Sequence, residues 1–133
     1  MTARLDAIGI IVAEMPRSLA FYRRLGLEIP EAADAEDHAE ATLPNGLRLM
    51  WDTEAGIATF DPKWRAPSGG PRTSLAFLCA DAAEVDRLYA ELTANGGTGE
   101  REPWDAVWGQ RYATVADPDG NSVDLFAALG DAS

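Results

Sequence analysis

The chain has 133 residues, an apolar fraction of 47% and a formal net charge of −11 at pH 7. This length fits a single domain, residues 1–133, with a sizeable buried core, and the apolar content excludes an intrinsically disordered chain. Because the acidic excess would repel phosphates, we expect no nucleic-acid partner and no anionic-membrane partner.

The N-terminal residues and the cysteine count predict the compartment. Met1 to Asp6 lack the basic stretch and apolar block of a secretory signal. No apolar run approaches the ~20 residues that a membrane span requires. The single cysteine, Cys79, excludes an internal disulfide and fits a reducing environment. We therefore expect a cytoplasmic protein.

The first half begins with a strand pattern and a helix pattern. The segment Ala7 to Leu25 is an apolar, β-rich run followed by apolar residues at helical spacing, with Leu19, Tyr22 and Leu25 on one stripe. Pro16 is acceptable in the opening turn of such a helix.

A hairpin follows in the first half. His38 to Leu43 and Leu47 to Asp52 have strand composition, and they flank Pro44-Asn45-Gly46, which is typical of a tight turn. The next segment, Thr53 to Arg72, is a loop rich in proline and glycine. A loop of that length in a compact domain is more often functional, or an arm that reaches a second subunit, than idle. Trp64 in this loop could belong to a lid or to a dimer contact.

The second half repeats the order at an offset of 67 residues. Ser74 to Leu92 again reads as a strand followed by a helix, and Asp81 with Glu84 predicts the N-terminal cap. The apolar stripe of this helix consists of Val85, Leu88, Tyr89 and Leu92.

Three further strands are expected after this helix. They cover Thr98 to Glu102, Gln110 to Ala116 and Asn121 to Ala127, and the last two flank the turn Asp117-Pro118-Asp119-Gly120. We therefore predict a βαβββ order that occurs twice, at about residues 4–52 and 72–128, joined by the loop 53–71.

Two motifs resemble those of the vicinal oxygen chelate superfamily, which includes glyoxalase I, extradiol dioxygenases and bleomycin-resistance proteins. They are RSLAFYRRLGLEI, from Arg17 to Ile29, and DPDGNSVDLF, from Asp117 to Phe126. The resemblance implies an α+β fold in which the two βαβββ repeats form a cupped mixed sheet with the helices outside. It also implies a cavity lined by the concave faces, and a homodimer.

The superfamily's enzymes hold a divalent cation with His, Glu or Gln side chains from four strands. The matching positions are Ala7, then Arg48 or Met50, then Ser74, and finally Asp124. Alanine has no donor atom, arginine repels a cation, and one carboxylate alone does not hold Zn²⁺ or Fe²⁺. We therefore expect neither a metal nor another cofactor. Asp124 could still act as a general base, or be a hydrogen-bonded remnant.

Strand alternation assigns the side chains that face the cup. The residues that we expect to bind a ligand are His38, Met50, Asp52, Trp104, Trp108, Gln110 and Tyr112. Two indoles, a phenol and an imidazole suit a flat, unsaturated ligand. Trp104 and Trp108 could instead pack in the core, where the parity of Trp51 places that residue.

The segment from Glu28 to Glu40 carries six acidic residues and no Lys or Arg. It is either a solvated edge or a cavity rim that attracts a cationic or amine-bearing ligand. Three functions stay open. The favoured one is metal-free sequestration of a planar antibiotic, as in the resistance branch of the superfamily. The resemblance to one member of that branch implies that His38 and Trp108 flank the planar ring. The others are a lyase or isomerase with a degenerate site, and a divergent interaction module.

Overall fold

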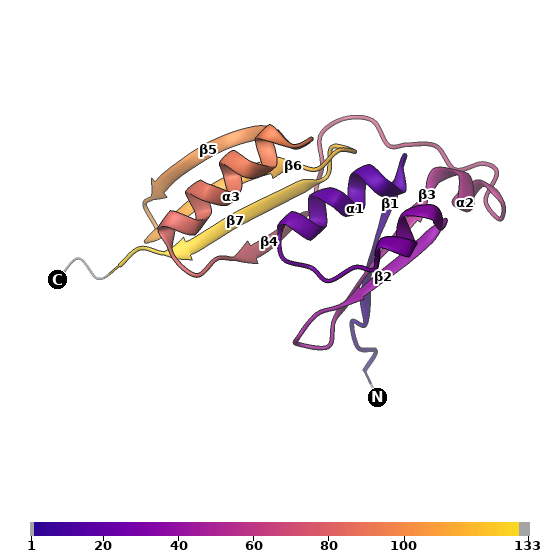
Figure 1. The fold of residues 1–133 in the computed structure, drawn as a ribbon, viewed down its shortest axis with the longest axis horizontal. Coiled ribbons are helices and arrows are strands. Elements are labelled where there is room, and N and C mark those ends of the chain that lie inside the picture. Colours follow the sequence, from indigo (N-terminus) through magenta and orange to yellow (C-terminus); the bar gives the residue numbers. More distant parts are fainter. Residues whose placement is uncertain (1, 131–133) are drawn as a thin grey trace. The chain divides into compact units, whose positions relative to one another are not determined.

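The computed structural model describes residues 2–130, which form the elements drawn in Figure 1. In chain order these are β1 (Ala7–Val12), α1 (Met15–Arg24), the 3₁₀ helix η1 (Glu31–Ala35), β2 (His38–Thr42), β3 (Arg48–Thr53), α2 (Glu54–Ala58), β4 (Ser74–Leu78), α3 (Ala82–Ala94), β5 (Thr98–Ala106), β6 (Gln110–Ala116) and β7 (Ser122–Ala128). The chain divides into two compact units, with the boundary between Ser68 and Gly69.

The first unit contains a three-stranded sheet in the order β1-β3-β2. β3 is parallel to β1 and antiparallel to β2. One face of the sheet is buried under α1, where the rings of Tyr22 and Trp51 lie 5.4 Å apart and both side chains are fully buried. Every second residue of β3 is buried, so the intervening residues form an opposite face that is turned away from this core.

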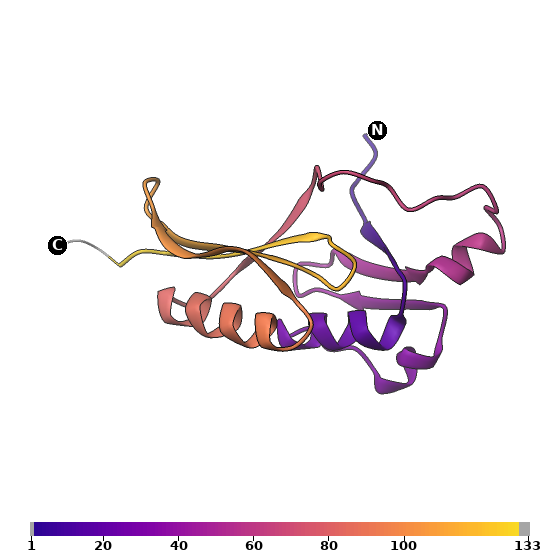
Figure 2. The same cartoon turned by 90° about the horizontal axis from the view of Figure 1, so that it is seen from above.

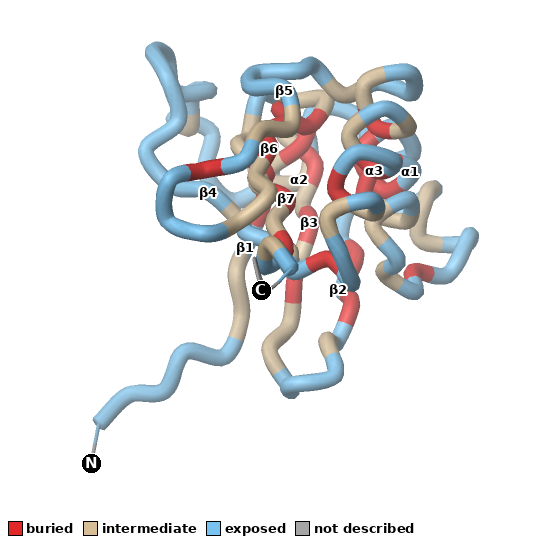
Figure 3. Tube along the Cα trace, turned by 90° about the vertical axis from the view of Figure 1, so that its left-hand side faces the viewer, coloured by how far each residue is buried: buried red, intermediate tan, exposed pale blue. Residues whose placement is uncertain are grey.

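The second unit contains a four-stranded sheet in the order β4-β7-β6-β5. Figure 2 shows α3 lying along one face of this sheet. Beneath the helix, Val115, Val123 and Leu125 are fully buried. Buried and half-buried positions alternate along β7 and, in β6, from Tyr112 to Val115 (Figure 3), as the period of two requires.

The predicted cap and turns are confirmed. Asp81 accepts a hydrogen bond from the backbone N–H of Glu84, and the Glu84 carboxylate accepts one from the N–H of Ala80, so two free donors at the start of α3 are satisfied. Gly46 and Gly120 have φ values of +90° and +88°, which a residue with a Cβ rarely adopts.

The α+β class is confirmed, with two differences in the strands. The first repeat has three strands among the described residues and not the four of a βαβββ unit, because the segment after β3 begins with the short helix α2. Thr53 caps that helix by accepting from the N–H of Gly56. In the second repeat, β5 continues four residues beyond the predicted end at Glu102. Among residues 2–130, no helix has the length and apolar character needed to cross a bilayer.

Candidate ligand-binding site

The predicted site residues lie on two sheet faces, one in each unit. In the first unit, Asp6, His38, Glu40, Arg48 and Asp52 form a connected set that we call the charged face. Met50 is half-buried and pairs in register with Glu40. In the second unit, a row of rings that we call the aromatic face consists of Trp104, Trp108, Tyr112 and Phe126.

His38 is the centre of the charged face. It pairs in register with Asp52 across β2 and β3, and Glu40 follows it two residues along the same side of β2. His38 Nδ1 lies 2.7 Å from Asp52 Oδ1, and Nε2 lies 2.7 Å from Glu40 Oε2. An ionised carboxylate only accepts hydrogen bonds, so two such partners require both ring nitrogens to donate. The geometry therefore favours a charged imidazolium.

The pKa shifts agree with this geometry. The hydrogen bond to Glu40, followed by the one to Asp52, raises the pKa of His38 above its ordinary value, while partial burial opposes the shift. The pKa of the Glu40 carboxyl is lowered, first by the hydrogen bond from His38 and then by the one from Arg48.

Arg48 extends the network to the start of the unit. Its guanidinium donates to Glu40 Oε1 at 2.6 Å and to Asp6 Oδ2 at 2.7 Å. Most charged atoms of the charged face are therefore paired with one another. One Asp52 oxygen is an exception, because the only hydrogen bond of this carboxylate among the described residues uses Oδ1.

The aromatic face is a continuous series of ring contacts. The ring centroids of Trp104 and Trp108 are 5.4 Å apart at an interplanar angle of 89°, and those of Trp108 and Tyr112 are 5.6 Å apart at 76°. Tyr112 stacks on Phe126 with centroids 6.2 Å apart. Edge-to-face and offset contacts of this kind are favourable and leave ring faces available for a further ring.

Trp108 does not occupy the strand position that its parity suggested. It lies in the turn between β5 and β6, where Gly109 has a φ of +91°. The side chain is 57% exposed, so the core alternative does not apply to it. Its Nε1 donates to Gln110 Oε1 at 2.8 Å, which fixes the edge of the indole and leaves its ring accessible.

Arg101 is a member of the site that sequence reasoning missed. Its guanidinium carbon lies 3.9 Å from the centroid of the Trp104 ring, a cation–π contact. The register of β5 against β6 shifts between Gly99 and Arg101, and again between Arg101 and Trp104. Because these irregularities break the period of two, parity could not reveal this contact.

Asp124 is held by two hydroxyl groups. Tyr112 Oη donates to Oδ2 at 2.6 Å, and Thr114 Oγ1 donates to Oδ1 at 2.9 Å. Burial, followed by the interaction with Asp124, raises the pKa of Tyr112 to about 12. Tyr112 therefore remains a neutral donor near neutral pH, and the arrangement fits a hydrogen-bonded carboxylate better than a free general base.

The positions that match the superfamily's metal ligands do not suit a cation. In the first unit, Ala7 pairs with Arg48 in the sheet, so one position has no donor and its neighbour is positively charged. In the second unit, Ser74 is uncharged and pairs in register with Ser122. Both oxygens of Asp124 accept hydrogen bonds from hydroxyl groups of the protein. Residues 2–130 contain no group of three or more His, Cys, Asp or Glu side chains arranged to hold a metal.

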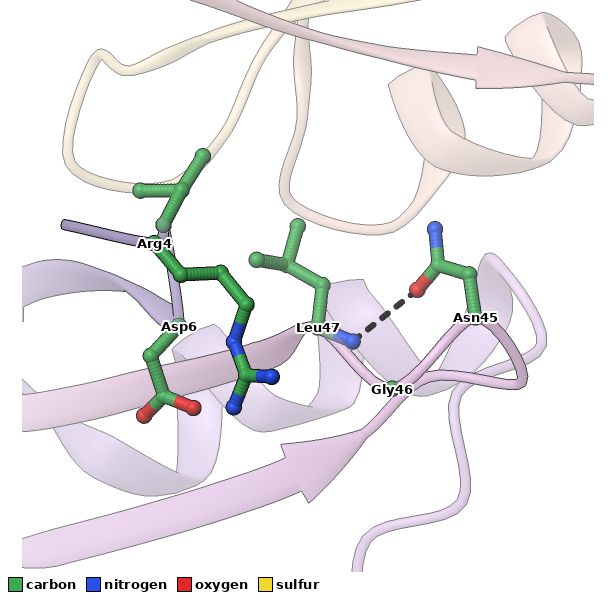
Figure 4. Close-up of a pocket in the computed structure, with 6 residues that line it drawn as sticks. Arg4, Asp6, Asn45, Gly46 and Leu47 are labelled. Atoms are coloured by element: carbon green, nitrogen blue, oxygen red, sulfur yellow. Dashed lines mark hydrogen bonds between the residues drawn. The ribbon is translucent and has the colours of Figure 1, made fainter. Parts of the chain in front are cut away.

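A shallow hollow of about 460 Å³ lies at the end of the first unit (Figure 4). It is lined by Arg4, Leu5, Asp6, Asn45, Gly46 and Leu47. Asn45 accepts from the N–H of Leu47, and Asp6 is engaged by Arg48. None of the predicted ligand-binding residues lines this hollow.

Comparison with known proteins places the chain in a family. The model of the Glyoxalase/Bleomycin resistance protein/Dioxygenase superfamily matches residues 4–125. The chain belongs to this superfamily. The match confirms the superfamily resemblance inferred from the two sequence motifs. No curated protein matches the chain.

Solved structures share the fold. A glyoxalase/bleomycin resistance protein/dioxygenase family enzyme from Burkholderia phytofirmans superimposes with a TM-score of 0.80 at 18% identity, covering 96% of this chain and 100% of the other. A glyoxalase-related enzyme from Fulvimarina pelagi gives 0.79 at 21% identity, covering 95% and 88%. A protein from Agrobacterium tumefaciens solved by NMR gives 0.72 at 28% identity, covering 97% and 100%.

Proposed function

We propose that this member of the superfamily is a binding protein that sequesters a planar aromatic or quinone-like antibiotic without altering it. The observation that carries the proposal is the aromatic face, in which an exposed Trp108 lies in contact with Trp104 and Tyr112. A flat ring gains both buried area and stacking on such a surface.

The chain also resembles one resistance protein, which binds mitomycin. The resemblance is carried by EIPEAAD (28–34), RLMWDT (48–53) and PWDAVWGQRYATVADPDGNSVDLFA (103–127). In that protein a histidine and a tryptophan flank the planar drug, and the matching positions here are His38 and Trp108. The sequences depart from each other in the linker loop and at neighbouring pocket positions.

The donor chemistry supports binding over catalysis. The positions that match metal ligands lack suitable donors, and the Asp124 carboxylate is occupied by Tyr112 and Thr114. Two hydroxyl donors that hold one carboxylate in place fit a structural role for Asp124 better than proton abstraction from a substrate. Elemental analysis of the purified protein tests this part, and about one divalent metal per chain would contradict it.

The binding test uses mitomycin C and bleomycin with calorimetric detection. We expect Trp108→Ala to lower the affinity for the bound drug at least ~30-fold, because truncating a strong binding-site anchor costs about 2 kcal/mol or more and 1.4 kcal/mol corresponds to a factor of ten. Phe60→Ala is the matched control. It removes an aromatic side chain that is even more exposed to solvent than Trp108 but belongs to neither face, and it should leave the affinity unchanged. A folded Trp108→Ala protein with wild-type affinity would show that the ligand binds elsewhere.

A further inference from the structure

Beside the aromatic face, the second sheet carries a row of polar side chains. Arg101 on β5 pairs in register with Thr114 on β6, and Thr114 pairs with Asp124 on β7. We call these three residues the polar row. Residues paired in register point to the same side of a sheet, and Tyr112 of the aromatic face donates to the same Asp124 carboxylate as Thr114 does. The polar row and the aromatic face therefore lie side by side on one surface of the second unit.

A strand irregularity puts Arg101 on this surface. Arg101 and Trp104 are three residues apart, and in a regular strand that spacing directs two side chains to opposite sides. The register of β5 against β6 shifts between them, so both side chains come to the same side. As a result, the guanidinium carbon of Arg101 lies 3.9 Å from the centroid of the Trp104 ring. The chain thus holds a cation at the β5 end of the polar row, against the aromatic face.

The hydrogen-bond donors of this cation are unused. Arg101 is exposed, and its guanidinium has no hydrogen bond and no ion pair among residues 2–130. Carboxylates are not scarce in this chain, which has 22 acidic residues against 11 lysines and arginines, and Arg48 and Arg111 each bind two of them. The contact with Trp104 is made through the guanidinium carbon, so the five N–H donors at the rim of the group remain available to a ligand.

The carboxylates around Arg101 do not compete for these donors. Asp124, at the other end of the polar row, accepts hydrogen bonds from two hydroxyl groups through its two oxygens. Glu100 and Glu102 adjoin Arg101 in the chain, and neither forms an ion pair with it. A negatively charged ligand group is therefore attracted to the β5 end of the polar row and repelled at the β7 end, which sets its orientation.

Trp104 connects the cation with the surface that takes a ligand ring. Its ring contacts the Arg101 guanidinium, and its centroid lies 5.4 Å from that of the exposed Trp108 indole. A ligand ring that stacks on Trp108 is thus one indole away from the guanidinium. An arginine binds a carboxylate through two parallel N–H···O bonds, and it stays protonated throughout the physiological pH range.

We propose that Arg101 binds an acidic oxygen group of the ligand, so that the aromatic face selects planar rings that carry a carboxylate. The ring lies on the aromatic face, and the carboxylate accepts from the Arg101 guanidinium at the β5 end of the polar row. This selectivity rests on the proposed function, since it specifies the ligand of the aromatic face.

The experiment compares two probes, 2-naphthoate and 2-naphthamide, by calorimetry at neutral pH. The two molecules share one ring system and nearly one shape, but only the naphthoate carries a charge. A salt concentration of ~0.15 M screens the long-range repulsion by the acidic chain. Because charge-assisted hydrogen bonds are stronger than neutral ones, we expect the wild type to bind the naphthoate about tenfold more tightly, or ~1.4 kcal/mol.

Three variants assign this preference to a residue. Arg101→Gln should abolish it, because glutamine keeps a polar side chain without the charge. Arg87→Gln is the matched control: it removes the same charge from an exposed arginine of α3, on the other face of the same sheet, and the preference should not change. Trp108→Ala should weaken both probes by similar factors, because it removes the ring contact that they share.

The outcomes separate this proposal from the proposed function. Equal affinity of the wild type for the two probes, or an unchanged preference in Arg101→Gln, would overturn the role of Arg101. Loss of the preference in Arg87→Gln would also overturn it, because net charge would then be the cause. Binding of mitomycin C without binding of either probe would overturn the carboxylate selectivity and leave sequestration standing. Failure of the drugs and of both probes alike would overturn the proposed function and this inference with it.

Discussion

At the scale of single residues, the sequence predicts which face a side chain takes but not which partner it binds. Parity placed His38 and Asp52 on one face, and the register of β2 against β3 agrees. Parity gives the direction of a side chain relative to the sheet, whereas a contact also depends on its rotamer. The double engagement of the imidazole was therefore outside the reach of sequence reasoning.

Tyr112 illustrates how a ligand-binding candidate can also be part of a fixed polar pair. Its hydroxyl is 2.6 Å from Asp124 Oδ2, and its pKa is raised to about 12 by burial first and by Asp124 second. We expect Asp124→Asn to lower the pKa of Tyr112 while leaving it above the ordinary value of a tyrosine, because burial persists. Titration of the Tyr112 ring by NMR measures this shift.

The control for this prediction is Asp119→Asn, in the turn before β7, because the raised pKa of Tyr112 comes from burial and from Asp124 and not from Asp119. It should leave the Tyr112 titration unchanged. If Asp124→Asn also left that titration unchanged, the hydrogen bond to Asp124 would contribute nothing in solution.

At the scale of elements, regular strands were predicted closely and irregular segments were not. The predicted strand Gln110 to Ala116 matches β6, and the strand expected at Asn121 to Ala127 differs from β7 by one residue at each end. Both were predicted closely because their residues alternate in polarity and turn residues lie between them. The end of β5 was missed, since Pro103 lowers strand propensity and the register of this strand is irregular. The segment 54–72 offered only loop composition, so the capped turn of α2 was not foreseen.

Trp51 is a core residue that joins a helix to a sheet, whereas Trp108 is exposed. It is fully buried on β3 against Tyr22 of α1, so its removal leaves a cavity between helix and sheet. We expect Trp51→Ala to lower the free energy of unfolding by about 3–5 kcal/mol. Chemical denaturation checks this value, and Trp108→Ala is the matched control, because the same truncation at an exposed turn should cost much less.

A second substitution refines the Trp51 prediction. Trp51 Nε1 is buried and has no hydrogen-bond partner among residues 2–130. An unpaired buried donor is itself unfavourable, so Trp51→Phe should cost clearly less than Trp51→Ala. Equal costs for the two variants would mean that ring volume is not what stabilises this contact.

At the scale of the whole molecule, the acidic excess is partly neutralised inside the first unit. Of the six carboxylates between residues 28 and 40, Asp34 pairs with Arg23 at 2.9 Å and Glu40 pairs with Arg48. Asp37 accepts a hydrogen bond from Thr53. These contacts favour the view that the segment is largely a structured, solvated edge.

The sheet edges and the linker are the features that bear on dimer formation. The edge strands β1, β2, β4 and β5 each pair with one neighbour in their own sheets, and such edges invite pairing with another chain. The linker carries the exposed Phe60 and the half-buried Trp64, and superfamily resemblance implies a two-fold dimer. We expect sedimentation at micromolar concentration to give twice the chain mass of 14.3 kDa.

If the linker contributes to that dimer, Trp64→Ala should raise the dimer dissociation constant at least about tenfold, which corresponds to ~1.4 kcal/mol of lost apolar contact. Lys63→Ala, at the adjacent exposed position, is the matched control and should leave the dissociation constant unchanged. Sedimentation over a dilution series measures both variants. A wild-type particle of 14.3 kDa would contradict the dimer. A dimer that is indifferent to Trp64→Ala would instead leave the sheet edges as the contact.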